Sequence, residues 1–315
     1  MLTLCSYPRP STAPNPTLGR FPTMAADVDP AVQRRRLRSE LRRLRTLRQL
    51  TQKEVAERVG WSPSKLIRIE TGQVGLSPSD LKALLNEYNV SDSETISSLA
   101  AMAKEGRRQQ WGRYRDVLNP DFLTYLRSES SAKTIRQAEP QVIPGLLQTE
   151  EYARAVIQGV GGTDLSTHAV DRQVEVRMKR QEIFDRPNPP EMFFIIDESA
   201  LRRPAGDADA MRHQLRHLGK IATLDHVHVR VVLLDSGIHP GLRGSFVLLE
   251  FPEPEDDDIL FLESSQTSLV TKDDTEAIDR YHKDFAHLET IAASEDETAR
   301  LIAAIDADLE RQSPL

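Results

Sequence analysis

The spacing of apolar residues divides this chain into a helical first part and a mixed second part. From Val32 to Arg48, leucines recur every three or four positions, the period of one helix face, at Leu37, Leu41, Leu44 and Leu47. Shorter stretches of this period follow at 52–59, 63–70, 78–88 and 91–108. We therefore expect a compact all-helical domain over residues 31–92 and a linking helix over 93–110. In that last helix the expected buried face is Ile96, Leu99, Ala100 and Ala103.

The period changes in the second part, which begins near Trp111. Helical spacing continues at 119–138, 146–156, 165–184, 209–224, 275–292 and 295–309. Between these helices, stretches rich in β-branched and aromatic residues indicate strands at 192–196, 227–234, 245–251 and 259–262. We expect an α+β fold overall, in which the all-α domain precedes a larger α+β domain over 111–315 with a sheet of about four strands.

The segment from Thr51 to Glu70 has the spacing of two short helices joined by a tight turn. Thr51 and Glu54 match a capping box, in which the hydroxyl accepts a backbone N–H and the glutamate reaches back. Ala56 falls where two helices must cross closely. Gly60 falls in the turn, where a positive φ favours glycine. This spacing predicts a helix-turn-helix, which places its second helix in the major groove of double-stranded DNA.

The second helix of this motif carries the expected base contacts. Ser62 is suited to cap it, and Pro63 occupies its first position. Ser64, Lys65 and Arg68 then point outward. Arg68 can take guanine O6 and N7 bidentately, Lys65 can reach the same edges or a phosphate, and Ser62 and Ser64 suit short hydrogen bonds.

Contacts to phosphate are expected from the start of the motif and from the arginines before it. Thr51 and Gln52 stand at the N-terminus of the first motif helix, where backbone N–H groups and the helix dipole favour an anion. Residues 31–70 hold twelve Lys/Arg against four Asp/Glu, a net charge of +8, in a chain of net −7, so the remainder carries −15. This basic segment predicts polyanion binding at one place only. Arg48 ends its run of arginines.

Other features narrow the class of protein. The chain has one cysteine, Cys5, which excludes an intramolecular disulfide framework and fits a reducing cytoplasm. No apolar run approaches the length of a membrane helix. Residues 1–30 are rich in proline and have almost no periodic apolar pattern, so we expect a disordered tail.

The N-terminal unit resembles the Cro/phage-repressor, or xenobiotic-response-element, type of helix-turn-helix. The similarity rests on the stretches 50–52, 55–56, 60–62 and 65–70, although Trp61 stands where such proteins often carry a small apolar residue. The second part resembles the C-terminal effector domain of many actinomycete transcriptional regulators. The matching stretches include 142–149, 152–154, 197–204 and 239–246, with Arg177, Arg180 and Gln181. The resemblance implies a nucleoid-associated regulator that binds two DNA half-sites as a homodimer.

The second domain offers candidates for an effector site but not for catalysis. Polar residues beside strand ends and chain breaks are the candidates for binding a small molecule or a small protein: Glu129, Gln148, Arg177, Arg180, Gln181 and Glu198. The motifs GxSxG, GxGxxG and the P-loop are absent, so we expect no enzyme and no cofactor. His213 and His217 lack an accompanying glutamate and a third ligand, so we expect a surface pair and no metal. The alternative is an antitoxin-like or partner-binding protein whose second domain has its own activity.

Overall fold

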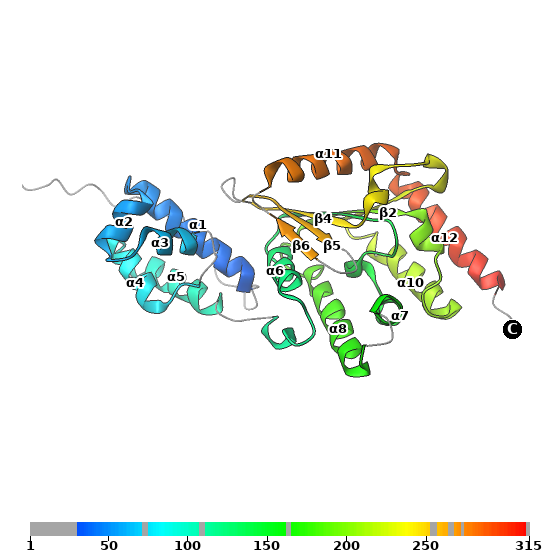
Figure 1. Cartoon of the computed structure of the whole chain (residues 1–315), viewed down its shortest axis with the longest axis horizontal. Coiled ribbons are helices and arrows are strands. Elements are labelled where there is room, and N and C mark those ends of the chain that lie inside the picture. The colour runs from blue at the N-terminus through cyan, green and yellow to red at the C-terminus, as the bar shows by residue number, and fades with distance from the viewer. Residues whose placement is uncertain are drawn as a thin grey trace, which may run out of the picture.

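The computed structural model describes residues 30–70, 75–106, 111–161, 165–252, 257–263, 268–271 and 274–312. They form a group of helices beside a larger unit built on a sheet (Figure 1). The expected tail up to residue 29, Cys5 within it, and the start of the loop after Glu70 lie outside the described residues. No described helix has both the length and the apolar content to cross a membrane.

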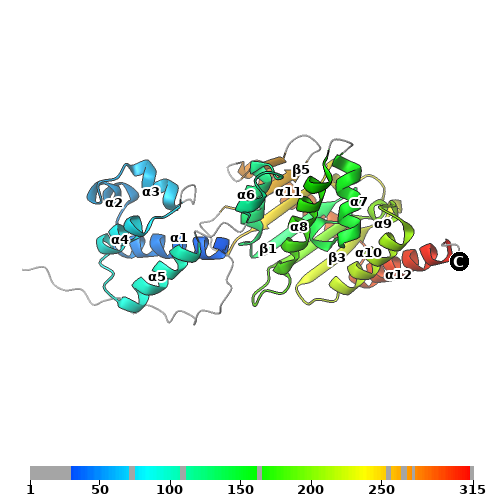
Figure 2. The same ribbon diagram turned by 90° about the horizontal axis from the view of Figure 1, so that it is seen from below.

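The described part of the N-terminal domain is all-helical, as predicted. It contains α1 (Pro30–Leu47), α2 (Gln52–Arg58), α3 (Pro63–Glu70), α4 (Pro78–Glu87) and α5 (Ser93–Glu105). α1 lies between α5 on one side and the pair α2–α3 on the other (Figure 2). Leu37, Leu41 and Leu44 of the predicted leucine stripe are almost fully buried and pack with residues of α2, α3, α4 and α5 in one apolar core. Leu47, the last leucine of that stripe, is 49% exposed, so the prediction is wrong there.

α5 belongs to this core and does not stand apart as a linking helix. It packs along α1 and buries Leu99 and Met102 in the N-terminal cluster. The predicted buried face is wrong at two positions, because Ile96 is 37% exposed and Ala100 is also exposed. Contact with α1 selects a face rotated by about one residue, on which Thr95 is buried instead.

The C-terminal domain is α+β, as predicted, and its described sheet has six strands in the order β3-β2-β1-β4-β5-β6. The strands are β1 (Thr134–Glu139), β2 (Glu191–Asp197), β3 (Val227–Val232), β4 (Phe246–Glu250), β5 (Ile259–Glu263) and β6 (Ser268–Thr271). β1, β2 and β3 run parallel, whereas β4 is antiparallel to β1 and continues into an antiparallel meander through β5 and β6. The prediction of about four strands was therefore short by β1 and β6.

β1 is central to the sheet, although the sequence predicted helix up to residue 138. The helix there, α6 (Pro120–Glu129), ends earlier, and the chain then enters β1. Ile135 and Ala138 are the apolar residues of β1, so it lacks a strand pattern of its own. Pairing with β2 on one side and β4 on the other stabilises this segment as a strand. Arg136 shows this, because its Nε donates to Glu250 of β4 over 2.6 Å and its guanidinium lies 4.6 Å from the ring of Phe193 in β2.

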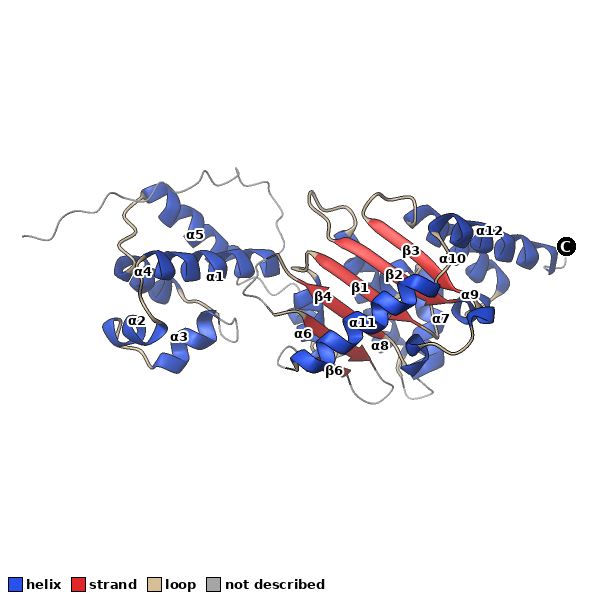
Figure 3. Cartoon of the chain, turned by 90° about the horizontal axis from the view of Figure 1, so that it is seen from above, coloured by secondary structure: helices blue, strands red, loops and turns tan. Residues whose placement is uncertain are grey.

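Helices cover both faces of the sheet unequally. One face packs against α6, α8 (Thr167–Arg180), α10 (Ala208–Ile221) and α12 (Glu295–Gln312), with α7 (Glu150–Gly161) and the short α9 (Glu198–Arg202) in the crossovers. On the opposite face α11 (Thr275–Ile291) crosses the strands obliquely (Figure 3). The helices predicted at 165–184, 209–224, 275–292 and 295–309 are thus confirmed, with shifted ends.

The two domains have separate apolar cores and meet through α1. The guanidinium of Arg35 lies 3.2 Å from the centre of the Phe251 ring, which directly follows β4. One residue earlier, Arg34 Nη1 donates to the carbonyl of Gly106 at the end of α5, over 2.7 Å. The first turns of α1 therefore contact both the second domain and the end of the helix that leads to it.

Candidate nucleic-acid interface

The two motif helices begin with the caps that the sequence predicts. The Thr51 hydroxyl accepts from the backbone N–H of Glu54 at 3.2 Å, and Glu54 accepts from the backbone N–H of Thr51 at 2.8 Å. The Thr51 contacts hold the pKa of the Glu54 carboxyl below its usual value. At α3, the Ser62 hydroxyl accepts from the N–H of Lys65 at 3.3 Å. Both helix starts are therefore set by local chemistry.

The turn between the helices has the predicted backbone. Gly60 has a φ of 70°, in the left-handed region. The N–H of Trp61 donates back to the carbonyl of Ala56 over 2.8 Å and closes the turn. Ala56 is fully buried at the crossing, as predicted. Trp61 is half-buried against the N-terminal core, so the larger side chain is accommodated at the edge of the motif.

A buried carboxylate, Glu70, joins three helices at the end of α3. Arg45 of α1 donates to both of its oxygens, over 2.8 Å and 3.0 Å. Gln52 of α2 donates to the same carboxylate over 2.8 Å, and Arg42 donates to the Glu70 carbonyl over 3.0 Å. The Glu70 side chain is 2% exposed. We call Arg42, Arg45, Gln52 and Glu70 the Glu70 cluster.

Sequence reasoning missed the role of Glu70. One signal was available, because a carboxylate in the last turn of a helix opposes the helix dipole and needs a compensating partner. The cluster also changes the interpretation of Gln52. Its amide is committed to Glu70 inside the motif, whereas the sequence predicted a phosphate contact. The side chain can still present its remaining N–H and its oxygen to DNA.

Arg48 also has an internal role. Its Nε donates to the carbonyl of Tyr88 over 2.7 Å, and its Nη2 donates to the carbonyl of Asn89 over 3.2 Å. These carbonyls lie at the C-terminus of α4, where a cation complements the helix dipole. The predicted phosphate contact of Arg48 would therefore compete with an intramolecular bond. Together with Arg34, Arg42 and Arg45, it shows that much of the arginine run holds the domain together.

α3 presents a mixed row of side chains to solvent. Ser64, Ile67 and Arg68 are exposed, at the i, i+3, i+4 spacing of one helix face. Ser64 and Ser62 share a hydroxyl–hydroxyl hydrogen bond of 3.2 Å. The sequence predicted the exposure of Ser64 and Arg68 and passed over Ile67, which is 42% exposed. Nothing in the apolar period required Ile67 to face outward, because Leu66 and Ile69 already complete the inner face.

Lys65 lies at the flank of this row. Its ammonium is 2.7 Å from Asp80 Oδ1, near the start of α4, and 3.9 Å from the centre of the Trp61 ring. Burial acts to raise the pKa of Asp80, but hydrogen bonds from Lys65 and Ser77 outweigh it and lower that pKa. Lys65 therefore connects α3 with α4, and it is still 39% exposed on the predicted DNA side.

Five of the six predicted effector residues come together in the second domain. Arg180 Nε donates to Glu129 Oε2 over 3.0 Å and its Nη2 to Oε1 over 2.6 Å. Arg177 donates to the side-chain oxygen of Gln148 over 2.8 Å. Gln181 donates to the Gln148 carbonyl over 2.5 Å. Glu198 lies elsewhere, after β2, where it accepts from Arg202 and from the backbone N–H of Leu234.

This polar network fastens helices to each other. It connects α6, α8 and the short turn of 3-10 helix at Gly145–Leu147. A Cβ on Gly145 would be 2.8 Å from Arg177 Nη1, so a larger residue there would require the guanidinium to shift. Because Glu129, Gln148 and Arg180 are buried and hydrogen-bonded, their first role is structural.

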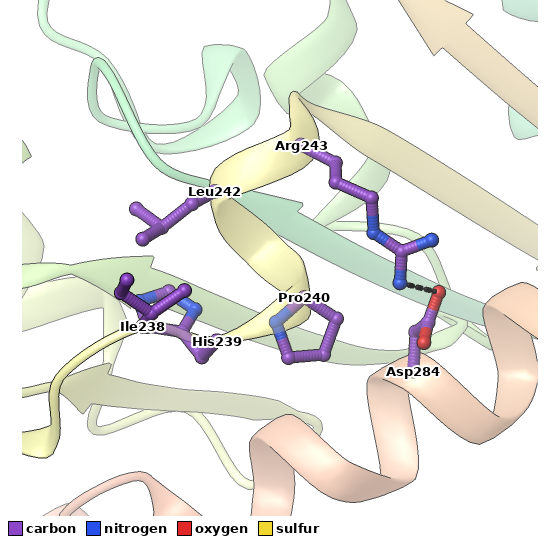
Figure 4. Close-up of a pocket in the computed structure, with 6 residues that line it drawn as sticks. All are labelled: Ile238, His239, Pro240, Leu242, Arg243 and Asp284. Atoms are coloured by element: carbon purple, nitrogen blue, oxygen red, sulfur yellow. Dashed lines mark hydrogen bonds and ion pairs between the residues drawn. The ribbon is translucent and has the colours of Figure 1, made fainter.

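An open hollow of about 560 Å³ lies at another place, on the connection from β3 to β4 (Figure 4). Ile238, His239, Leu242, Arg243 and Asp284 are among the residues that line it. Arg243 and Asp284 form an ion pair of 2.6 Å, and the buried His239 lies 3.2 Å from Asp197. None of the predicted effector residues lines this hollow. Among the described residues, no group of three metal-ligating side chains occurs here or elsewhere.

The fold and this geometry define a helix-turn-helix DNA-binding protein. Residues 36–95 match a family model described as "Helix-turn-helix domain", and residues 122–304 match "Domain of unknown function (DUF5753)". The second match covers more than half of the chain, so the protein belongs to the DUF5753 family. No curated protein and no solved structure shows significant similarity to it.

Proposed function

We propose that this protein is a sequence-specific transcription regulator that inserts α3 into the major groove. The observation that carries the proposal is a pair of exposed polar side chains on a helix whose orientation is fixed by contacts on its buried side. Ser64 and Arg68 face solvent, while the Glu70 cluster ties the end of α3 to α1 and α2. A preorganised recognition helix loses little conformational entropy on binding.

Arg68 is the principal base contact in this proposal. No described residue forms a side-chain hydrogen bond or ion pair with it, so its guanidinium is available for guanine O6 and N7. Ser62 and Ser64 add short hydrogen bonds, and Thr51 places the N-terminus of α2 against a phosphate. Lys65 pairs with Asp80 and must break this ion pair to contact DNA. We therefore assign it to a phosphate at the edge of the site.

Substitution of Arg68 tests the proposal. We expect Arg68→Ala to weaken binding to the cognate site by about 1–3 kcal/mol and to relax the preference at one base pair. Selection of bound sequences from a random pool gives the site, and titration on cognate and random DNA gives the difference. Arg58→Ala is a matched control, because Arg58 is an exposed cation of α2 paired with Glu87 over 3.0 Å. Equal weakening on both DNAs would refute base readout by Arg68.

The protein acts as a homodimer in this proposal. One motif contacts only a few base pairs, and two motifs would bind half-sites about one helical turn apart. The selected site should then be a palindrome, and sedimentation should give twice the mass of the chain. A single unrepeated half-site bound by a monomer would contradict the dimer. Such a regulator acts in the cytoplasm at the nucleoid.

The DUF5753 domain is the input domain in this proposal, binds a small molecule or a small protein, and has no catalytic role. Its support is the contact of Arg35 with Phe251, which connects that domain to α1, the helix whose Arg45 binds Glu70. Thermal shift of the full chain against metabolites tests the ligand, and capture of proteins from the native extract tests the partner. Turnover of any small molecule by the full chain would favour the enzymatic alternative.

A further inference from the structure

The exposed face of α3 contains one apolar side chain among polar ones. Ile67 is 42% exposed, at i+3 from Ser64 and next to Arg68. Single exposed apolar residues are common on protein surfaces and need no explanation in general. The position of Ile67 is different, because it shares its helix face with the two side chains that the proposed function assigns to base edges.

The chemistry of the major groove supplies a partner for an apolar side chain. Of the four bases only thymine presents a methyl group there, and apolar side chains recognise thymine by contact with it. Ser64 and Arg68 provide hydroxyl and guanidinium groups, which cannot distinguish that methyl group from hydrogen. A β-branched side chain such as Ile67 is stiff at χ1, so its methyl groups are held in place before binding.

We infer that Ile67 is a specificity-determining residue that selects a thymine methyl group beside the guanine bound by Arg68. The inference rests on the proposed function and deepens it, because it names part of the DNA sequence. Each half-site should contain a thymine adjacent to a guanine, either on the same strand or in the neighbouring base pair on the opposite strand. Packing of Ile67 against the methyl group excludes water from both apolar surfaces.

Removal of the methyl group from the DNA provides the sharpest test. Deoxyuridine replaces thymidine with no change in hydrogen-bonding groups, so a thymine-to-uracil scan of the selected site isolates the methyl term. We expect one position per half-site at which the full-length protein loses about fourfold in affinity, since burial of one such group contributes ~0.8 kcal/mol. For Ile67→Ala, uracil and thymine at this position should bind equally. Replacement of the thymine–adenine pair by 5-methylcytosine–guanine should retain part of the preference over unmethylated cytosine.

Ile96→Ala is the matched control. Ile96 is 37% exposed in the same domain but lies on α5, across α1 from the motif, so its truncation should leave the methyl preference unchanged (Figure 2). Circular dichroism of both variants identifies any loss of fold, and Ile67→Val then serves as the milder variant.

The outcomes separate the inference from the proposed function. A selected site whose scan shows no methyl-sensitive position, or one whose sensitivity persists in Ile67→Ala, overturns the role of Ile67 and leaves the regulator proposal intact. Failure to select any sequence at all overturns both. A methyl-sensitive position that disappears in Ile67→Ala and persists in Ile96→Ala establishes the contact.

Discussion

At the scale of single residues, Gly60 shows how backbone conformation alone can set an element. Its φ of 70° lies in the left-handed region, and a Cβ built there would meet nothing within 4 Å. Any cost of substitution therefore comes from the conformation and not from a clash. The tight turn between α2 and α3 includes this left-handed residue.

We predict that Gly60→Ala lowers the free energy of unfolding by about 1 kcal/mol, because L-residues disfavour the left-handed region. Gly60→Asn should cost less, since asparagine visits that region more readily. Gly75→Ala is the matched control, because Gly75 also has open space around its Cβ position but has no positive φ. Chemical denaturation measures all three variants. A loss in Gly75→Ala equal to that in Gly60→Ala would contradict the conformational explanation.

At the scale of elements, the Glu70 cluster determines how three helices meet. Glu70 is 2% exposed and Arg45 is 14% exposed, so their ion pair is largely withdrawn from water. Removal of one partner leaves the other charge buried and unpaired. The free-energy cost of that unpaired charge is larger than the net stabilisation that the pair provides. The cluster therefore makes the orientation of α3 sensitive to one side chain.

Glu70→Gln should reduce stability by about 3 kcal/mol and weaken DNA binding through misplacement of α3. Glu87→Gln is the control, because Glu87 pairs with Arg58 at the surface and its loss should cost less than about 1 kcal/mol. Trp61 fluorescence in a Trp111→Phe background follows the N-terminal domain, since these are the two tryptophans of the chain. Equal destabilisation by both substitutions would refute the special role of burial.

A second element-scale prediction concerns pH. His282 of α11 lies 3.0 Å from Asp258, which precedes β5. The hydrogen bond to Asp258 raises the pKa of His282, and burial opposes it more weakly. Because the pKa is raised in the folded state, this contribution is fully present below the unfolded pKa of His. It is lost as the pH rises through the folded pKa.

We therefore expect the stability of the wild type relative to His282→Gln to be greater at about pH 5.5 than at about pH 8. Thermal denaturation at the two pH values gives the difference. His217, whose pKa is lowered by burial, acts in the opposite direction but contributes equally to both proteins. His287→Gln is the control on the same helix, at an exposed position. Equal pH dependence of stability in the wild type and in His282→Gln would exclude the Asp258 pair as a source of it.

At the scale of the whole molecule, the contact between Arg35 and Phe251 connects the two domains. The guanidinium lies 3.2 Å from the ring centre, which is close enough for a desolvated cation–π interaction. α1 has this contact near its start and Arg45 near its end. The contact between the domains and the ion pair with the carboxylate of Glu70 therefore lie on the same helix.

A double-mutant cycle tests this connection. We expect Arg35→Ala and Phe251→Leu to be non-additive by about 1 kcal/mol in the stability of the N-terminal domain. Arg36→Ala with Phe251→Leu is the control cycle, since Arg36 is the exposed neighbour of Arg35. Additivity of Arg35→Ala and Phe251→Leu within about 0.3 kcal/mol would show that the domains do not communicate through this contact.

Local patterns in the sequence determined much of this protein. The leucine stripe of α1, the capping box at Thr51, the turn at Gly60 and four apolar strands each depend on neighbours a few positions apart. Such features are stabilised within one element, so their signals are visible in the order of residues. These local features were sufficient to predict an α+β fold with a helix-turn-helix in its first domain.

The tertiary structure alone decided what depends on distant partners. β1 has few apolar residues and is a strand because β2 and β4 pair with it on both sides. Arg34, Arg42 and Arg45 of α1, and Arg48 just after it, which a charge count assigns to DNA, donate instead to carbonyls and to Glu70. Packing showed that Ile67 also faces outward, beside Ser64 and Arg68, whose exposure the helical period had already predicted.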